Sequence, residues 1–443
     1  TGKEMYDNKY FLFPVWQGNS WLDKPPLIPL LYGTVSKIFF MVPAEISTRV
    51  FTLTIASVVL FFVYLLAFRA SKDKLVSLLT TAITAFTPIF LQRAQVINLD
   101  VFLLLGWLGY LLFFENFLAG LFFLGVAVMS KSLIGFYPAA IFFGFYSYLL
   151  ITKKISVKKY KSIVLKIALQ VGILAMWFVS MLLLYGERFW RMHIIESHFR
   201  RVTASIESHF GERTYYLTLA LEQMGFLAWF ALGSTLYLGM QFLKKKLDGL
   251  TLLYSFYLVP WFLFLNLTKT KIFWYFYAAI PQFAYLGSLP LSFIKKNKVA
   301  YLGLGIVFLL VILGKAFFTD KLMTKKYSDF SPTYKLAAFA KEVCPNLQVL
   351  IDPEGRTMFQ TLDKLGLLIT TTKWWGQHPQ IVYYFEKPVT FVYEKSKLSK
   401  TIADKNTCFI VDDKDIDVSF MVPSVLLKNV DSLSLYQSLP ETQ

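Results

Sequence analysis

Apolar residues are grouped along the chain into stretches of about twenty, separated by short polar segments. A helix of this length covers a hydrocarbon core of about 30 Å, so each stretch predicts a membrane-spanning helix. We therefore expect a polytopic α-helical membrane protein whose transmembrane domain covers residues 46–317. The candidate spans lie at residues 46–68, 75–96, 101–117, 118–130, 134–151, 163–185, 216–242, 249–267, 272–293 and 299–317.

Positively charged loops give these spans an orientation. Four clusters of basic residues share one parity, because they follow the first, fifth, seventh and ninth spans, at Arg69, Lys154, Lys245 and Lys296. The positive-inside rule assigns them to the cytoplasm. The opposite side then receives residues 1–45, the turns at Asp100 and Lys131, the loops 186–215 and 269–271, and the C-terminal segment. We expect an inner (plasma) membrane protein with an extracytoplasmic C-terminal domain.

Residues 1–45 form the first outer region. The stretch 27–42 is apolar enough to span, but a span here would invert the parity and leave Arg69 outside. We interpret it as a helix at the outer interface that begins after Pro25 and Pro26. Neither a span nor a signal-peptide pattern precedes this region, so we expect that one helix comes before Thr1 in the full protein.

The pattern changes in the C-terminal segment, residues 318–443. Short β-type runs at 348–351, 389–392 and 408–411 alternate with helical runs at 332–343 and 396–403. This alternation predicts a small soluble α/β domain. Both cysteines, Cys344 and Cys408, lie in it; an oxidising compartment would allow a bridge, and two free buried thiols fit the sequence equally well.

Composition supports lipid as the main solvent of the chain. Of its 443 residues, 56% are hydrophobic and 16% are charged, which is too apolar for a water-exposed surface. A net charge of +17 would suggest nucleic acid in a soluble protein. Here most lysines lie in short loops between spans, so we interpret the charge as a determinant of topology and expect membrane lipids, not nucleic acid, as partners.

Charged residues recur on the predicted outer side. Charge at a membrane edge is costly and needs an explanation. Lysine and arginine there suit a phosphate whose lipid tail stays in the membrane, and nearby carboxylates can take a proton from an attacking group. Five segments thus predict one shared outer cavity: Asp23-Lys24, Asp100, Lys131, Glu196 to Arg201, and Lys269 to Tyr275.

Simpler roles also fit most of these residues. Lys24 fits a lysine that snorkels to the interface, and Asp100 fits the cap of a helix that begins at Val101. Lys131 is harder to explain this way, because its turn is short enough to hold it near the membrane edge. Solvated-loop or aromatic-belt roles fit His198, one of Arg200 and Arg201, the pair Lys269 and Lys271, and Trp274 with Tyr275.

These residues stand in an order known from one family. The run Lys3-Glu4-Met5, Pro14, Gly18 and Asp23-Lys24-Pro25-Pro26-Leu27 resembles the first outer loop of the C-type glycosyltransferases, the bacterial aminoarabinose transferase and protein O-mannosyltransferase-like group. The resemblance covers roughly residues 3–290. The further similar positions are Arg49, Asp100, Met129 to Ser132, Glu196 to Arg201, Tyr215-Tyr216, Lys271, Tyr275 and Pro281.

The resemblance implies a membrane glycosyltransferase that takes a sugar from a polyprenyl-phosphate carrier and transfers it to a lipid, protein or glycan acceptor. It implies a catalytic carboxylate at Asp100, and a divalent metal at Asp23 and His198. The implied ligands of the lipid phosphate are Lys24, Lys131, Arg201, Lys271 and Tyr275. Two positions differ from the family pattern: Ser132 replaces a glycine, and the family's acidic Asp-Glu pair would lie before Lys3.

Two other functions are alternatives to glycosyl transfer. A flippase or transporter of lipid-linked sugars predicts charges deep in mid-span and repeats between the two halves, and the sequence has neither pattern. A non-catalytic scaffold that presents the C-terminal domain to a partner gives no reason for five outer segments to carry phosphate-type chemistry. The sequence therefore favours an enzyme.

Overall fold

The computed structural model describes residues 1–443 except 320–330, 376–378, 396, 399–406, 416–423 and 440–443. The chain divides into two units. The first contains residues 1–14, 22–203 and 209–325, and the second contains residues 15–21, 204–208 and 326–443. Residues 15–21 and 204–208 therefore belong to the second unit, although residues of the first unit flank them in the sequence.

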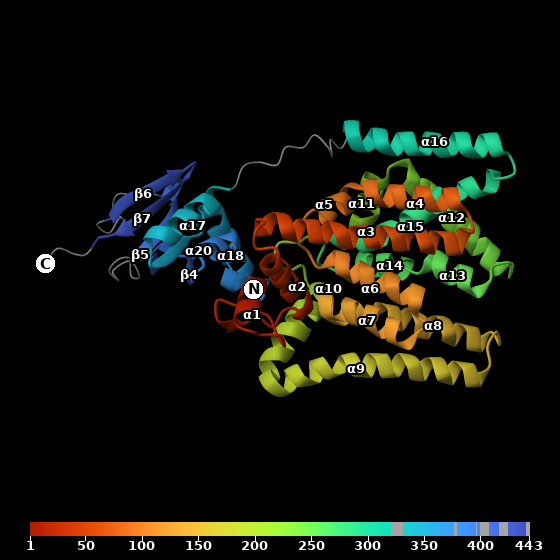
Figure 1. The fold of residues 1–443 in the computed structure, drawn as a ribbon, viewed down its shortest axis with the longest axis horizontal. Coiled ribbons are helices and arrows are strands. Elements are labelled where there is room, and N and C mark those ends of the chain that lie inside the picture. The colour runs from red at the N-terminus through yellow and green to blue at the C-terminus, as the bar shows by residue number, and fades with distance from the viewer. Residues whose placement is uncertain (320–330, 376–378, 396, 399–406, 416–423, 440–443) are drawn as a thin grey trace. The chain divides into compact units, whose positions relative to one another are not determined.

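The first unit is helical throughout its described regular structure, and Figure 1 shows its long helices α3, α9 and α16 running in roughly the same direction. Its elements are α1 (Gly2–Asp7), α2 (Leu27–Ile38), α3 (Ala44–Ser71), α4 (Lys74–Phe86), α5 (Pro88–Ala94), α6 (Asp100–Phe113), α7 (Phe117–Lys131), η1 (Ser132–Phe136), α8 (Tyr137–Ile151), α9 (Val157–Phe189), η2 (Trp190–Phe199), α10 (Arg200–Thr203), α11 (Tyr215–Met224), α12 (Phe226–Leu243), α13 (Gly249–Phe256), α14 (Val259–Leu267), η3 (Phe273–Ala279), α15 (Ile280–Ser288), η4 (Leu289–Ile294), α16 (Lys298–Gly314) and η5 (Lys315–Thr319).

Many of these helices are long and apolar enough to cross a membrane. Among the described residues, five helical runs meet that description, and up to seven do if the bent pairs α4–α5 and α13–α14 each count as one span. The apolar helices α2 and α6 are shorter. The chain is a multi-pass membrane protein, and about ten spans remains a prediction.

The two ends of α6 have different surroundings. At its first residue, the Asp100 carboxylate pairs with cations. Near its last residue, the Leu112 carbonyl accepts a hydrogen bond from Arg69 Nη1 at 3.0 Å. Lys295, from another predicted cytoplasmic cluster, pairs with Asp73, the N-cap of α4, with 3.2 Å between Nζ and Oδ2. Residues predicted to lie outside and inside are therefore at opposite ends of α6, and which end faces the cytoplasm stays a prediction.

Two predicted segments differ from the structure. The loop expected over 186–215 is helical as far as Thr203. The chain bends at Gly186, where φ is +51°, then completes α9 and continues through η2 and α10. The span expected over 272–293 is divided into η3, α15 and η4. Pro281 and Pro290 lie at the starts of α15 and η4, where a missing N–H is tolerated.

The second unit contains a five-stranded sheet in the order β4-β3-β5-β7-β6. Strands β4 and β5 are parallel to β3, and β7 is antiparallel to β5 and β6. The predicted α/β domain is confirmed, although the predicted helix 396–403 lies largely outside the described residues. The elements are β1 (Val15–Trp16), β2 (Asn19–Ser20), α17 (Pro332–Val343), β3 (Asn346–Leu350), α18 (Pro353–Lys364), α19 (Thr372–Trp375), α20 (Pro379–Phe385), β4 (Val389–Val392), β5 (Thr407–Asp412), η6 (Asp413–Asp415), β6 (Ser424–Val430) and β7 (Leu433–Ser438).

A disulfide resolves the open question about the cysteines. Cys344 and Cys408 are bonded, with their Cα atoms 5.9 Å apart. Cys344 directly follows α17 and Cys408 lies in β5, so the bond joins the helix to the sheet. Both sulfur-bearing residues are buried in the core of this domain, beside Leu336 and Val349.

Candidate functional site

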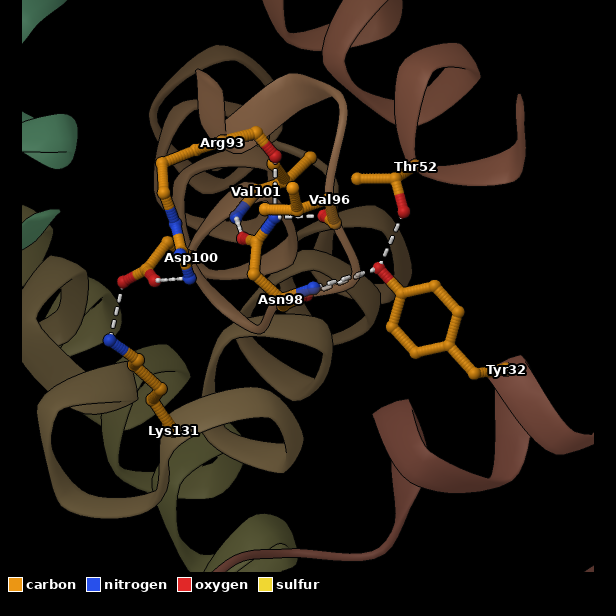
Figure 2. Close-up of polar contacts among 8 residues, drawn as sticks. All are labelled: Tyr32, Thr52, Arg93, Val96, Asn98, Asp100, Val101 and Lys131. Atoms are coloured by element: carbon orange, nitrogen blue, oxygen red, sulfur yellow. Dashed lines mark hydrogen bonds and ion pairs between the residues drawn. The ribbon is translucent and has the colours of Figure 1, made fainter. Parts of the chain in front are cut away.

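The best-defined polar cluster of the first unit is built around Asp100. Its carboxylate pairs with Lys131 Nζ through Oδ1 and with Arg93 Nη2 through Oδ2, the latter at 3.1 Å (Figure 2). The three side chains are 7%, 11% and 18% exposed, so water screens their charges little. Asp100, Arg93 and Lys131 come from α6, α5 and the end of α7, and they form a buried cluster with two cations and one carboxylate.

Asp100 does not cap α6. The Val101 N–H donates to Oδ1 of Asn98 at 3.1 Å instead. The Asn98 amide also donates to the carbonyls of Arg93 and Val96, and its N–H donates to the Tyr32 hydroxyl, which bonds Thr52 at 2.8 Å (Figure 2). This network fixes the turn between α5 and α6, which leaves both oxygens of Asp100 for its cations.

Aromatic rings lie against the two cations. The Lys131 ammonium lies 4.7 Å from the ring centroid of Tyr275, and the Arg93 guanidinium lies 5.3 Å from that of Trp274. Cation–π contacts of this kind favour the charged form of the side chain away from water. The segment with Trp274 and Tyr275, predicted as outer, is therefore brought to the Asp100 cluster.

Asp23 forms a second acidic centre. It is 6% exposed, and its Oδ2 lies 2.8 Å from Lys24 Nζ, while its Oδ1 is buried without a hydrogen-bond partner among the described residues. Burial alone would raise the pKa of Asp23, but the charges of Lys24 and Arg201 outweigh it and hold the pKa below its usual range. The charge of Arg201 also acts on Lys131, which links the two centres electrostatically.

A cavity of about 250 Å³ lies beside these centres. Arg201, His198 and Tyr275 line it, and most of the remaining wall is apolar, with Leu133 and Phe264 among its side chains. The Nε2 atom of His198 is buried without a hydrogen-bond partner among the described residues. The cavity thus combines a mostly apolar wall with the side chains of Arg201, His198 and Tyr275.

Lys271 differs from the other predicted phosphate ligands. It is 4% exposed, and its ammonium donates to the carbonyls of Leu265 and Asn266 at 3.1 and 3.0 Å, at the C-terminal end of α14. Burial lowers the pKa of Lys271. Its ammonium therefore caps α14, directly behind the cavity wall that Leu265 contributes.

The residues predicted for a divalent metal do not form a metal site by themselves. Among the described residues, no group of three or more His, Cys, Asp or Glu side chains could hold an ion. Asp23 and His198 each leave one atom unbonded, but Lys24 and Arg201 add positive charge where a cation would lie. The donor set does not fit a metal, and the prediction gains no support from the structure.

Arg93 was missed as a candidate. It lies within the stretch predicted as the span 75–96, where a charge is costly and calls for a partner. That cost was a usable signal, since the structure pairs Arg93 with Asp100, seven residues later.

No protein-family model matches the chain. An uncharacterized protein of Aquifex aeolicus (strain VF5) is 28% identical over 343 residues, which are 75% of this chain and 64% of that protein, so the chain spans less than two thirds of its relative. Solved structures are similar over more of the chain. ArnT from Cupriavidus metallidurans bound to undecaprenyl phosphate has a TM-score of 0.65 at 14% identity, over 100% of this chain and 93% of ArnT.

A second solved structure, the oligosaccharyltransferase AglB from Archaeoglobus fulgidus in complex with an inhibitory peptide and a dolichol-phosphate, has a TM-score of 0.60 at 14% identity. It covers 93% of this chain, which spans 64% of AglB. Sequence identity this low carries the fold alone. The resemblance inferred from the sequence is confirmed at that level: the chain has the fold of the C-type glycosyltransferases ArnT and AglB.

Proposed function

We propose that this protein is a membrane glycosyltransferase that takes a sugar from a polyprenyl-phosphate carrier and transfers it to a lipid, protein or glycan acceptor. The observation that carries the proposal is the buried cluster in which Arg93 and Lys131 share the single carboxylate of Asp100. Its surplus positive charge is costly in apolar surroundings, and a bound anion would balance it.

The cavity supports a lipid-borne anion over a soluble one. Its wall is mostly apolar, which suits the isoprenoid units next to a phosphate, and Arg201 with Tyr275 offers donors to the phosphate itself. His198 Nε2 provides one more hydrogen-bonding atom without a partner among the described residues. ArnT was solved with undecaprenyl phosphate and AglB with dolichol-phosphate, and we infer the same class of donor lipid here.

The reaction we propose inverts the configuration of the sugar. An acceptor hydroxyl or amine loses its proton to a carboxylate, its lone pair forms the new bond to the anomeric carbon, and the bond from that carbon to the phosphate oxygen breaks. The phosphate leaves with the bonding electrons. Lys131, Arg201 and Lys24 stabilise the negative charge that develops on it.

The roles of the two carboxylates follow from their surroundings. Asp100 already faces Arg93 and Lys131, so we propose that it keeps these cations at the phosphate as the active-site carboxylate. Asp23, in contrast, has an oxygen without a hydrogen-bond partner among the described residues, as a proton acceptor requires. Asp100→Asn should therefore raise KM for the donor lipid, whereas a proton acceptor, once changed to an amide, loses kcat at an unchanged KM.

The proposed reaction occurs at the outer face of the inner membrane, since the positive-inside rule assigns the opposite end of the helices to the cytoplasm. The second unit is then extracytoplasmic, and the disulfide between Cys344 and Cys408 supports an oxidising surrounding.

Transfer of a radiolabelled sugar from polyprenyl-phosphate in liposomes tests the proposal. Arg201→Ala should reduce transfer at least tenfold, because a charge-assisted hydrogen bond to the leaving phosphate is worth about 1.5–3 kcal/mol. Arg213→Ala, at an exposed arginine twelve residues later, is the matched control and should keep wild-type turnover. Product analysis separates a flippase, which leaves the bond between sugar and phosphate intact. Equal transfer by both variants would reject the assignment.

A further inference from the structure

His193 is a buried histidine that neither the predicted site nor the cavity uses. It lies in η2 and is 0% exposed. Its Nε2 lies 2.5 Å from the Ser132 hydroxyl, and its Nδ1 lies 2.7 Å from the carbonyl oxygen of Leu22. Leu22 directly precedes Asp23 and Lys24, and Ser132 directly follows Lys131. One imidazole thus touches both segments that carry a lysine of the site.

The two contacts define the hydrogens on the ring. A carbonyl oxygen only accepts, so Nδ1 carries the proton and donates to Leu22. In the neutral ring, Nε2 then accepts from the Ser132 hydroxyl. A serine oriented by a histidine in this way is the arrangement of an activated nucleophile. Both side chains are 0% exposed, so a sugar has no access to them, and the pair has a positional role.

The surroundings of His193 hold its ring in place. The ring stacks on Phe189 with 4.6 Å between centroids, and Trp177 and Phe178 approach it edge-on. A second side chain of η2, Ser197, donates to the carbonyl of Asp23 at 3.3 Å. Helix η2 therefore forms hydrogen bonds with two successive backbone carbonyls, those of Leu22 and Asp23.

The hydrogen bond from Ser132 to His193 stabilises an unusual backbone conformation at Ser132. Ser132 has φ +61° and ψ −132°, a conformation that favours glycine and strains other residues. This turn ends α7 and directs the Lys131 side chain toward Asp100 and Tyr275. The hydrogen bond to His193 holds the hydroxyl where the strained turn places it, and the imidazole resists relaxation of the turn.

We infer that His193 is a positioning residue that fixes the segments of Lys24 and Lys131 relative to each other, so that both lysines act on one phosphate. The inference rests on the proposed function for the identity of that anion. Its structural half, the joining of residues 22–24 to residues 131–132, stands on the contacts of His193 alone.

Hydrogen–deuterium exchange on the full-length protein in liposomes tests the structural half. His193→Ala should raise exchange in both segments, near residues 22–24 and near residues 131–135. Ser132→Ala, which loses the bond to His193 and leaves the contact of His193 with Leu22 in place, should raise it only in the second. Ser130→Ala is the matched control, because the buried Ser130 hydroxyl donates only within its own helix, to the Ala127 carbonyl, and exchange should stay at the wild-type level.

Binding of undecaprenyl phosphate and of undecaprenol, the same lipid without phosphate, tests the functional half. His193→Ala should weaken binding of undecaprenyl phosphate about tenfold, the equivalent of one hydrogen bond, and leave undecaprenol unchanged. His193→Gln, whose amide can donate and accept, should recover part of the loss. A merely structural role would weaken both lipids equally.

Three results decide between the positioning role of His193 and the proposed function. Unchanged exchange in both segments of His193→Ala overturns the positioning role, whatever the lipid data show. If the wild-type protein binds both lipids equally well, the proposed function fails, and the exchange data still decide whether His193 joins the segments. Raised exchange with undiminished preference for the phosphate also overturns the inference.

Discussion

Replacing Asp100 with asparagine should destabilise the protein more than removing either of its cations. The asparagine side chain has nearly the same shape as aspartate, but it lacks the negative charge that Arg93 and Lys131 share. Two cations are then left buried beside each other without a counter-ion. Lys131→Met, by contrast, leaves the carboxylate paired with Arg93 at 3.1 Å.

The magnitudes follow from the geometry. Each contact of Asp100 is a charge-assisted hydrogen bond, worth about 2 kcal/mol when both groups are largely buried. Lys131→Met removes one such bond and should cost about 2 kcal/mol. Asp100→Asn weakens both and exposes the repulsion between the cations, so it should cost about 4 kcal/mol, within the range for breaking a buried ion pair.

Unfolding by SDS in mixed micelles, followed by tryptophan fluorescence, measures these differences. The double variant Asp100→Asn with Lys131→Met leaves only one unpaired cation, so it should be less destabilised than the sum of the single variants, by about 2 kcal/mol. Additive effects in this cycle, or wild-type stability of Asp100→Asn, would refute the shared-carboxylate interpretation.

Two further predictions concern the second unit. Burial alone would raise the pKa of Asp415, but Arg356, at 2.7 Å, and Lys395 outweigh it and hold the pKa below its usual range. The stabilisation that the ionised Asp415 gives the fold is therefore present above the unfolded pKa of about 4 and is lost as the pH falls through the lower folded value. By calorimetry, Arg356→Met should therefore be about 2 kcal/mol less stable at pH 7, and the difference should vanish well below pH 4, whereas a difference that persists there contradicts the pairing. Reducing the disulfide between Cys344 and Cys408, 64 residues apart, should cost this domain about 4 kcal/mol and leave the helical transition unchanged; loss of both transitions together would contradict it.

The helices were predictable where the apolar run was long and uninterrupted. The span predicted at 46–68 corresponds to α3, because nothing within it breaks the helix. The prediction failed where single residues control the backbone. Gly186 adopts φ +51° within a helical region, and polar residues after it suggested a loop, although they continue as η2. Hydropathy reports where a segment can be buried, but it does not report such local changes of direction.

The candidate site was predictable as a list of charged residues, because each charge at a membrane edge is costly wherever it lies. Their pairing was not. Asp100 fitted a helix cap as well as a site residue, and only the position of the Asn98 side chain, which takes the capping bond, decides between them. His193 carries no signal in the sequence, since the role that we infer for it comes from its contacts with the Leu22 carbonyl and the Ser132 hydroxyl, which are far from it along the chain. A search for costly charges therefore does not find a residue that acts by hydrogen bonds to distant segments. In the role that we infer for it, His193 determines whether the charges of this site can meet.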